Sequence, residues 1–227
     1  MSYARTQFGL ALGVLLFLGL TAVAAPWQIP TDLPRYELDM HIDVDRHQVK
    51  VRQTILWTNR HDREAHEIVF NVHSHYKLPE KDIPFIAKML EILRLAPSDA
   101  LDTEGHACEI CRVTVNTAGS PSRTYDPASC DRPVSHSEMP HYWEKNQTAF
   151  EVPLPKPAAK GESVSVVLDY TLTLPQKQGR WGQWKGVTFL SNWHPVVAFY
   201  DNHGWQPSPF IPWHQPFFNE AGSLTPK

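Results

Sequence analysis

The sequence has little net charge, few cysteines and no second long apolar run. Its 21 Lys and Arg against 24 Asp and Glu leave a formal charge of −3. A balance so close to neutral argues against a nucleic-acid-binding protein, and no acidic or basic tail stands out. After residue 25, no stretch is apolar over the roughly 20 residues that a membrane span needs. The 20 prolines favour strands and loops over long helices.

The first 24 residues predict a cleaved export signal. Arg5 supplies a positive charge, residues 8–20 form an almost unbroken apolar run, and Ala22-Val23-Ala24 has small residues at the cleavage spacing. The alternative is a membrane anchor, but the run is short and no basic cluster follows it. We therefore expect a mature chain that begins at Ala25, is periplasmic or secreted, and is not attached to a membrane.

Three cysteines lie in one polar segment, and Cys130 belongs to a long loop predicted over 118–146. In an oxidising compartment, the first expectation is a disulfide that joins Cys130 to either Cys108 or Cys111. The alternative is a metal site, because Cys108 and Cys111 have ligand spacing. A histidine would then complete the tetrahedron that the three thiolates begin. The candidates are His106, His136 and His141.

Alternating apolar and polar residues predict an all-β protein with antiparallel strands. Residues 36–44 and 49–57 each follow a period of two, with Gln53 as the one polar residue on the inner face of the second segment. The short polar turn between them predicts a hairpin. Further strands are predicted at 68–72, 112–116, 149–154 and 164–174. Such a set indicates a β-sandwich or a saddle-shaped sheet.

One helix is predicted inside this β pattern, from about residue 83 to residue 95. Pro84 suits its first turn, where a missing N–H leaves no bond unmade. Apolar residues then recur at helical spacing. They are Phe85, Met89, Ile92 and Leu93. We expect this apolar face to pack against one face of the sheet.

No catalytic motif is complete in the sequence. His61 and His66 are five residues apart, whereas the His-Glu-x-x-His motif of zinc peptidases requires four, and that motif occurs nowhere in the chain. A nucleophile elbow, a phosphate loop and a dinucleotide fingerprint are also absent. His73 and His75 flank Ser74 at strand spacing, but two histidines alone make a weak zinc site. We interpret them as a polar strand end.

The C-terminal quarter of the chain concentrates aromatic residues among turn residues. Its tryptophans are Trp181, Trp184, Trp193, Trp205 and Trp213. Such rings can pack in a core or against a neighbouring domain, or they can form a platform on which sugars or peptides stack. We favour packing, because aromatic side chains bury a large area wherever a core or an interface is available.

Taken together, these segments resemble the N-terminal domain of the aminopeptidase N family of zinc metallopeptidases. The resemblance begins with residues 36–43 and with Trp57-Thr58-Asn59, where a strand ends. Its most specific part is the block Gly179-Arg180-Trp181-Gly182, Asn192-Trp193-His194-Pro195, Val197-Ala198-Phe199-Tyr200-Asp201 and Gly204-Trp205. It implies a β-domain over 25–222, in which about 77–147, with the helix and the cysteines, resembles an insertion found in a subgroup.

The resemblance implies a role other than catalysis for this chain. In the family, zinc is held by the two histidines of His-Glu-x-x-His and by a later glutamate, all in the domain that follows. We therefore expect no catalytic residue, no metal and no cofactor in this chain. The N-terminal domain packs against the catalytic domain and can offer a polar side chain to the free amine of the substrate. The candidates for this cleft or interdomain contact are Trp181, Trp184, Trp193, His194, Tyr200, Asp201 and Trp205.

The last five residues, 223–227, depart from the resemblance. Another alternating strand is expected after Gly222, so we interpret these residues as a truncated tail and expect the catalytic domain to be missing or to act in trans. A sheet without its last strand has an open edge, which favours self-association. An alternative function is a secreted module that binds carbohydrate or peptide through a tryptophan-rich surface.

Overall fold

The computed structural model describes residues 30–126, 139–212 and 219–227 of the chain. All that follows concerns the compact unit Asp32–Lys227. The expected signal (1–24), Cys130, His136 and Trp213 lie outside the described residues. No helix in the described part of the chain combines the length and the apolar character needed to cross a membrane.

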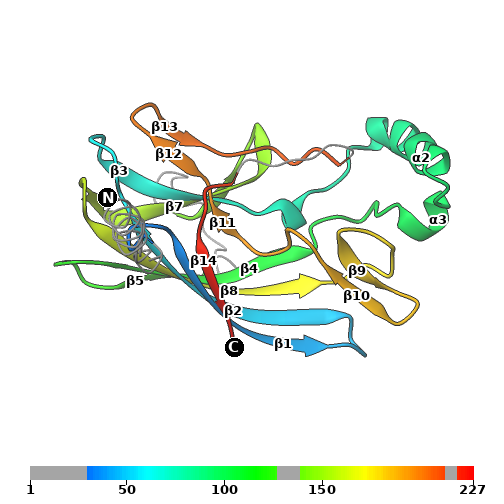
Figure 1. Cartoon of the computed structure of the whole chain (residues 1–227), viewed down its shortest axis with the longest axis horizontal. Coiled ribbons are helices and arrows are strands. Elements are labelled where there is room, and N and C mark those ends of the chain that lie inside the picture. Colours follow the sequence, from blue (N-terminus) through cyan, green and yellow to red (C-terminus); the bar gives the residue numbers. More distant parts are fainter. Residues whose placement is uncertain (1–29, 127–138, 213–218) are drawn as a thin grey trace, which may run out of the picture. The chain divides into compact units, whose positions relative to one another are not determined.

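Two sheets form the body of this unit (Figure 1). The larger sheet has the strand order β14-β1-β2-β8-β4-β5, and the smaller sheet has the order β11-β3-β7-β6. The larger sheet consists of β1 (Arg35–Asp43), β2 (Gln48–Thr58), β4 (Cys108–Thr117), β5 (Arg123–Tyr125), β8 (Ser163–Thr173) and β14 (Ser223–Pro226). The smaller sheet consists of β3 (Ala65–Asn71), β6 (His141–Trp143), β7 (Asn146–Ala158) and β11 (Val196–Val197). The predicted all-β class is confirmed.

Both sheets contribute side chains to one hydrophobic core. Ile55 and Leu168 of the larger sheet and Ile68 and Phe70 of the smaller sheet are fully buried in the same cluster. Along β8, the buried residues alternate with less buried ones. This period of two is the reason why the sequence pattern could be interpreted as half-buried strands. One face of each sheet therefore packs on the other sheet.

The predicted hairpin is present, and its inner face is covered along only part of its length. β1 and β2 pair antiparallel, with Arg35 opposite Leu56 at one end and Asp43 opposite Gln48 at the other. At the start of β1 the inward residues are buried, but Ile42, near its end, is 40% exposed. Alternation alone shows which side of a strand faces inward, and the position of the second sheet decides how far that side is covered.

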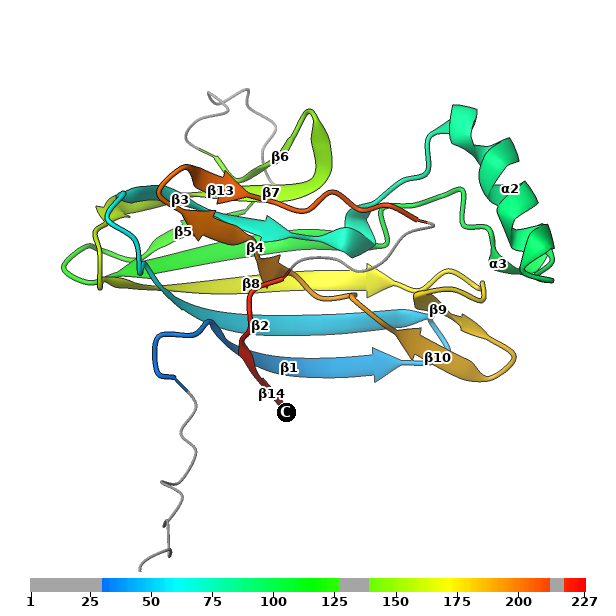
Figure 2. The ribbon, with the colours of Figure 1, turned by 45° about the horizontal axis from the view of Figure 1, so that its top comes forward.

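Residues 76–106, here called the helical excursion, leave the sheets after β3 and return at β4. They contain η2 (Glu80–Asp82), α2 (Ile83–Ile92) and α3 (Pro97–Ala100). Figure 2 shows α2 and α3 at one end of the strands, as does Figure 1. The predicted helix is therefore confirmed, and it lies inside the segment that resembles a subgroup insertion.

The packing that we expected for α2 is wrong. Phe85 is 52% exposed, and Ile92 and Leu93 are 66% and 65% exposed, whereas Ile86 is the buried residue of this helix. The helix therefore turns a different side inward from the one that the apolar spacing indicated. The reason is its place beyond the ends of the strands, where none of the described strands presents a face to the Phe85 side.

The tail of the chain is a strand of the larger sheet. β14 pairs in parallel with β1, with Ser223 opposite Arg35. Lys227 Nζ then lies 2.8 Å from Glu37 Oε2. The edge of β1 that we expected to be open is therefore covered by residues that we placed outside the domain. β14 is short and contains Pro226, two features that discourage further pairing at a sheet edge.

The C-terminal quarter forms short strands that the sequence pattern did not reveal. β9 (Trp181–Trp184) and β10 (Val187–Leu190) make one two-stranded ribbon, and β12 (Phe199–Asp201) and β13 (Gly204–Gln206) make another. β5 and β6 likewise fall within the predicted loop at 118–146. Strands of two to four residues are too short for a period of two to be recognised.

Candidate functional site

A recess beside Trp193 brings together polar side chains from distant parts of the sequence. It has a volume of about 230 Å³. Its lining residues are His73, Leu190, Asn192, Trp193, His194, Val196, Asn219 and Leu224. Two of them, Trp193 and His194, are candidates from the sequence. This Trp193 recess is the candidate functional site.

The backbone of the Trp193 segment is held by buried side chains from the sheets. The hydroxyl of Ser74 donates to the carbonyl oxygen of Trp193 at 2.6 Å, and Nε2 of Gln53 donates to that of Pro195 at 2.7 Å. Asn192 precedes them with a φ of 51°, in the left-handed region that few residues other than glycine adopt. Hydrogen bonds from Ser74 and Gln53 therefore hold the backbone that forms the wall of the recess.

The two histidines of the recess are neutral near pH 7. Burial lowers the pKa of His73 to about 4; a hydrogen bond with the Ser208 carbonyl opposes this effect, and Arg180 adds to it. Burial also lowers the pKa of His194, against a hydrogen bond with the Pro195 carbonyl. Because Nδ1 of His194 donates to that carbonyl at 3.1 Å, its Nε2 is left as an acceptor.

Two amides lie at the mouth of the recess. Asn192 and Asn219 are both exposed. Oδ1 of Asn219 accepts a hydrogen bond from Nδ2 of Asn71 at 3.4 Å, and Oδ1 of Asn71 accepts one from the backbone N–H of Ser208 at 3.0 Å. No carboxylate or thiol is among the described residues that line the recess. Amide and imidazole acceptors beside an indole suit the binding of an N–H donor.

Trp181 and Trp184 lie on β9 and do not line the recess. The Trp181 ring packs on Phe210 with 5.4 Å between centroids, and the Lys185 amino group lies 5.4 Å from the Trp184 ring. Trp181 and Trp193 are each 8% exposed, whereas Trp184 is half-buried. Burial leaves Trp181 and Trp193 no open face on which a sugar could stack.

Tyr200 and Trp205 pack with Trp57 in the core. The Tyr200 ring lies 5.6 Å from the Trp57 ring and 4.6 Å from the Trp205 ring. The hydroxyl of Tyr200 donates to the carbonyl oxygen of Glu64 at 2.9 Å, and the indole N–H of Trp205 donates to that of Glu67 at 3.1 Å. These contacts attach the hairpin of β12 and β13 to β3 and to the turn before it.

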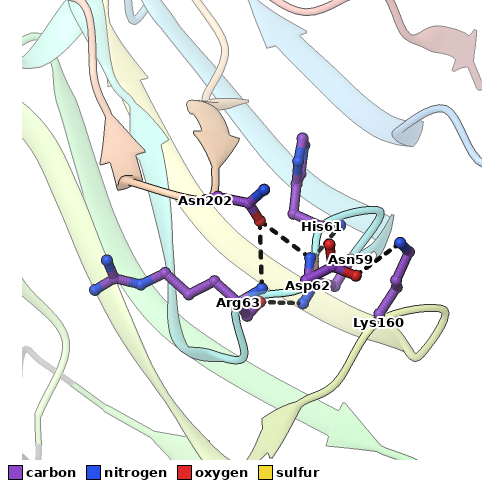
Figure 3. A network of polar contacts seen from close by, with 6 residues as sticks. All are labelled: Asn59, His61, Asp62, Arg63, Lys160 and Asn202. Carbon is purple, nitrogen blue, oxygen red and sulfur yellow. Dashed lines mark hydrogen bonds and ion pairs between the residues drawn. The ribbon is translucent and has the colours of Figure 1, made fainter.

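A polar network joins this hairpin to the turn after β2 (Figure 3). Oδ1 of Asn202 accepts hydrogen bonds from the backbone N–H groups of Asp62 and Arg63 at 3.1 and 3.4 Å. Nδ2 of Asn59 donates to the Arg63 carbonyl at 2.8 Å, and Nζ of Lys160 lies 2.8 Å from Oδ1 of Asp62. Asn59 is the last residue of the Trp-Thr-Asn segment that carried the resemblance.

Asp201 closes the hairpin turn. One of its carboxylate oxygens accepts from the backbone N–H of His203 at 2.7 Å, and the other accepts from Nε2 of Gln206 at 2.9 Å. Both oxygens therefore have a partner inside the hairpin. Of the seven candidates from the sequence, the structure brings only Trp193 and His194 into the recess.

His73 and His75 do not form a strand end. They belong to the 3-10 turn η1 (His73–His75), so their rings meet different surroundings. His73 lines the recess, whereas His75 stacks on Tyr142 with 3.7 Å between ring centroids. The spacing of two was interpreted as a strand, and it is a tight helical turn instead.

Cys108 is buried and Cys111 is exposed, and no disulfide joins the two. Burial raises the pKa of the Cys108 thiol to about 12, so it stays protonated and is a poor metal ligand. Within residues 30–126, 139–212 and 219–227, no group of three His, Cys, Asp or Glu side chains could hold a metal ion. The disulfide with Cys130 stays a prediction, because Cys130 lies outside the described residues.

Sequence reasoning missed three polar residues of the recess. His73 was assigned to a strand end, Asn192 was quoted for the resemblance without a role, and Asn219 was not considered. His73 and Asn219 are separated by most of the described chain, and no motif spacing connects them. The fold alone makes them neighbours.

Three solved structures to which the chain is similar are of M1 zinc metallopeptidases. Two are of a two-domain M1 enzyme variant, bound to L-arginine (14% identity, TM-score 0.36) or to L-tryptophan (16%, 0.36). The third is of a variant from Deinococcus radiodurans bound to a Tyr-Ser-Ala substrate (15%, 0.37). The matches cover 70% of this chain for the L-arginine complex and 78% for the other two. The matches cover 26% of the solved chain in the L-arginine complex and 28% in the other two structures. This chain therefore spans about a quarter of the length of those solved chains.

No protein-family model matches the chain, and no curated protein sequence matches it. The residues that hold zinc in the resembled family have no counterpart here, because His-Glu-x-x-His is absent from the sequence. The described residues therefore do not fit a catalytic zinc site.

Proposed function

We propose that this chain is the non-catalytic N-terminal β-domain of an exported, aminopeptidase N-like zinc metallopeptidase. Its role is to pack against a catalytic domain and to shape the substrate cleft. The observation that carries the proposal is the Trp193 recess, because three of its lining residues, Asn192, Trp193 and His194, belong to the block where the sequence resemblance to that family is most specific.

The chemistry of the recess suits one end of a peptide substrate. The amide oxygens of Asn192 and Asn219 and the free Nε2 of His194 accept hydrogen bonds, and an amino group donates them. A neutral imidazole does not repel an ammonium group as a charged one would, and burial keeps both His73 and His194 neutral. The recess therefore recognises the free amine of the substrate without taking part in bond cleavage.

The proposed partner is a zinc-peptidase domain that carries His-Glu-x-x-His, in the same polypeptide or in trans. Zinc then belongs to the partner. The first place to look for it is the reading frame directly downstream of the gene. An open reading frame there with no peptidase motif, together with no such domain elsewhere in the genome, would contradict the proposal.

A reconstitution experiment tests the role of the recess. The chain is co-expressed with that catalytic domain, and hydrolysis of an aminoacyl anilide is measured. We expect no hydrolysis by the chain alone and hydrolysis by the pair. Asn192→Ala should raise KM at least several-fold with little change in kcat, because a contact to the bound amine contributes binding energy. The matched control is Asn202→Ala, which removes an amide from the network of Figure 3 and should leave KM unchanged.

Two results would overturn this assignment. One is hydrolysis by the purified chain alone. The other is an equal KM for the parent and the Asn192→Ala variant when each is paired with the catalytic domain. Complex formation is followed separately by analytical ultracentrifugation, so a failure to assemble is distinguished from a recess that plays no part in binding.

We also propose that the protein is exported. The support is the charged start, apolar run and small residues of positions 1–24. Expression in a bacterium with an intact secretion system should give a periplasmic or secreted product whose N-terminus is Ala25, as read by intact-mass spectrometry. Retention of Met1 on a cytoplasmic product would count against export.

A further inference from the structure

The two ends of the helical excursion meet at a pair of histidines. His75 stands just before the excursion and His106 is its last residue, and their ring centroids are 4.4 Å apart with the planes tilted by 50°. The other face of His75 stacks on Tyr142, with an interplanar angle of 5°. The His75 ring is therefore held between His106 and Tyr142 at the neck of the excursion, the point where its two ends meet.

The hydrogen bonds of the two rings leave the same nitrogen of each unprotonated. Nδ1 of His75 lies 3.0 Å from the carbonyl oxygen of Cys108, and Nδ1 of His106 lies 3.0 Å from that of His75. A carbonyl oxygen only accepts, so each Nδ1 carries the proton and each Nε2 keeps its lone pair. An N–H donated to a backbone carbonyl is the arrangement that orients histidine ligands in metal sites.

The backbone at the neck is shaped to bring His106 over His75. Gly105 and His106 both have positive φ values, 66° and 50°. A Cβ on Gly105 would lie 2.6 Å from Cα of Lys77, so the two ends of the excursion touch here. Left-handed backbone at a residue other than glycine is strained, and such strain gathers at functional sites.

The electrostatic surroundings favour a cation. His106 lines a surface cavity of about 660 Å³ that opens the neck to solvent. Its charged lining residues are the acidic Asp102, Glu104 and Glu109 and the basic Arg46 and Lys177.

We propose that His75 and His106 bind one divalent transition-metal ion, Zn²⁺ or Cu²⁺, through their Nε2 atoms and so close the neck of the helical excursion. The ion keeps water in its remaining positions, because no third protein ligand converges among the described residues. It would be a clamp that is separate from the catalytic zinc of any partner domain. The site does not depend on the proposed function.

Metal binding is tested on the full chain in a Cys111→Ser background, which removes the exposed thiol as a competing ligand. Zn²⁺ and Cu²⁺ affinities are measured by competition with a chromophoric chelator. We expect one ion per chain, with His75→Gln and His106→Gln each weakening binding about tenfold or more. The control is His203→Gln, an exposed histidine in another hairpin, which should change nothing. Unchanged affinity in both test variants would overturn the proposal.

A second measurement reads the geometry directly. In ¹⁵N-imidazole NMR spectra of the metal-free chain, His75 and His106 should both show the tautomer protonated at Nδ1, and metal should shift their Nε2 signals. Metal should also slow proteolysis between residues 77 and 105 in the parent and in His203→Gln, but not in His106→Gln. Rings protonated at Nε2 in the metal-free chain, or cleavage that metal does not slow, would contradict the site.

Discussion

Nε2 of Gln53, on the inner face of β2, donates a hydrogen bond at 2.7 Å to the carbonyl oxygen of Pro195. This bond links the first hairpin to the segment that forms the wall of the Trp193 recess. Oε1 of Gln53 accepts a hydrogen bond from the hydroxyl of Tyr170 at 2.9 Å, so both the oxygen and the nitrogen of the buried amide have a partner. The single lapse in the apolar alternation of β2 is therefore the residue that fixes the recess to the sheet.

Gln53→Leu should destabilise the protein by about 2–3 kcal/mol, because the buried Tyr170 hydroxyl and the Pro195 carbonyl each lose a partner. Chemical denaturation measures the change. In the double variant Gln53→Leu/Tyr170→Phe, part of that loss should be recovered, since one stranded hydroxyl is gone. A Gln53→Leu variant as stable as the parent would show that the bond to Pro195 does not hold the recess wall.

Tyr200→Phe should lower the free energy of unfolding by about 1 kcal/mol. The change keeps the ring against Trp57 and Trp205 but removes the hydroxyl that reaches the carbonyl oxygens of Arg63 and Glu64. Tyr76→Phe is the matched control, because the Tyr76 ring packs on Phe210 in another part of the chain. Equal losses of stability in the two variants would argue against a specific contribution from the hydrogen bonds of the Tyr200 hydroxyl.

Stability should fall as the pH drops from 6.5 towards 4. Unfolded His73 takes up a proton near the ordinary histidine pKa of 6.5, whereas burial holds its folded pKa at about 4. Between these values the unfolded state binds more protons, so acid favours unfolding, with a loss of about 3 kcal/mol for this one group. Below pH 4 its contribution levels off.

The variant His73→Gln separates this contribution from the others. Burial lowers the pKa values of His75 and His194 as well, so they add to the acid sensitivity in the same direction. In the variant, the free energy of unfolding should therefore fall less steeply with decreasing pH than in the parent, but it should still fall. Urea denaturation curves at pH 7, 5.5 and 4 measure this dependence. A slope identical to that of the parent would mean that folding does not lower the pKa of His73.

Removal of residues 223–227 should increase self-association of the chain. The deletion takes β14 from the sheet and leaves the edge of β1 that faces away from β2 without a partner strand. An open strand edge recruits other chains. Light scattering at several concentrations measures the change. Lys227→Ala is the control, because it removes only an exposed ion pair with Glu37, which contributes little. A monodisperse monomer after the deletion would show that β14 does not protect the edge.

The sequence was sufficient for the elements with a long, regular period. Residues 36–44, 49–57 and 164–174 alternate over enough positions for the inward side to be identified, and the helix near 83–95 has a clear helical spacing. Each of these depends on contacts between neighbours in the chain, which periodicity reports directly. The class of the fold follows from them.

The candidate site needed the tertiary structure. His73, Asn192 and Asn219 meet only because β3, the Trp193 segment and the chain before β14 cross one another, and no local pattern encodes such a crossing. For the same reason the pairing of His75 with His106 is visible only where the excursion returns to its starting point.

The sequence by itself determined where the long strands lie, where the one long helix begins and that the zinc-peptidase motif is absent. Only the tertiary structure decided which side of α2 is covered, that the tail completes a sheet, and which polar groups share a recess. The physical reason is that secondary structure follows from side-chain periodicity over a few residues. Burial and proximity, in contrast, depend on which distant segments compete for the same apolar surface.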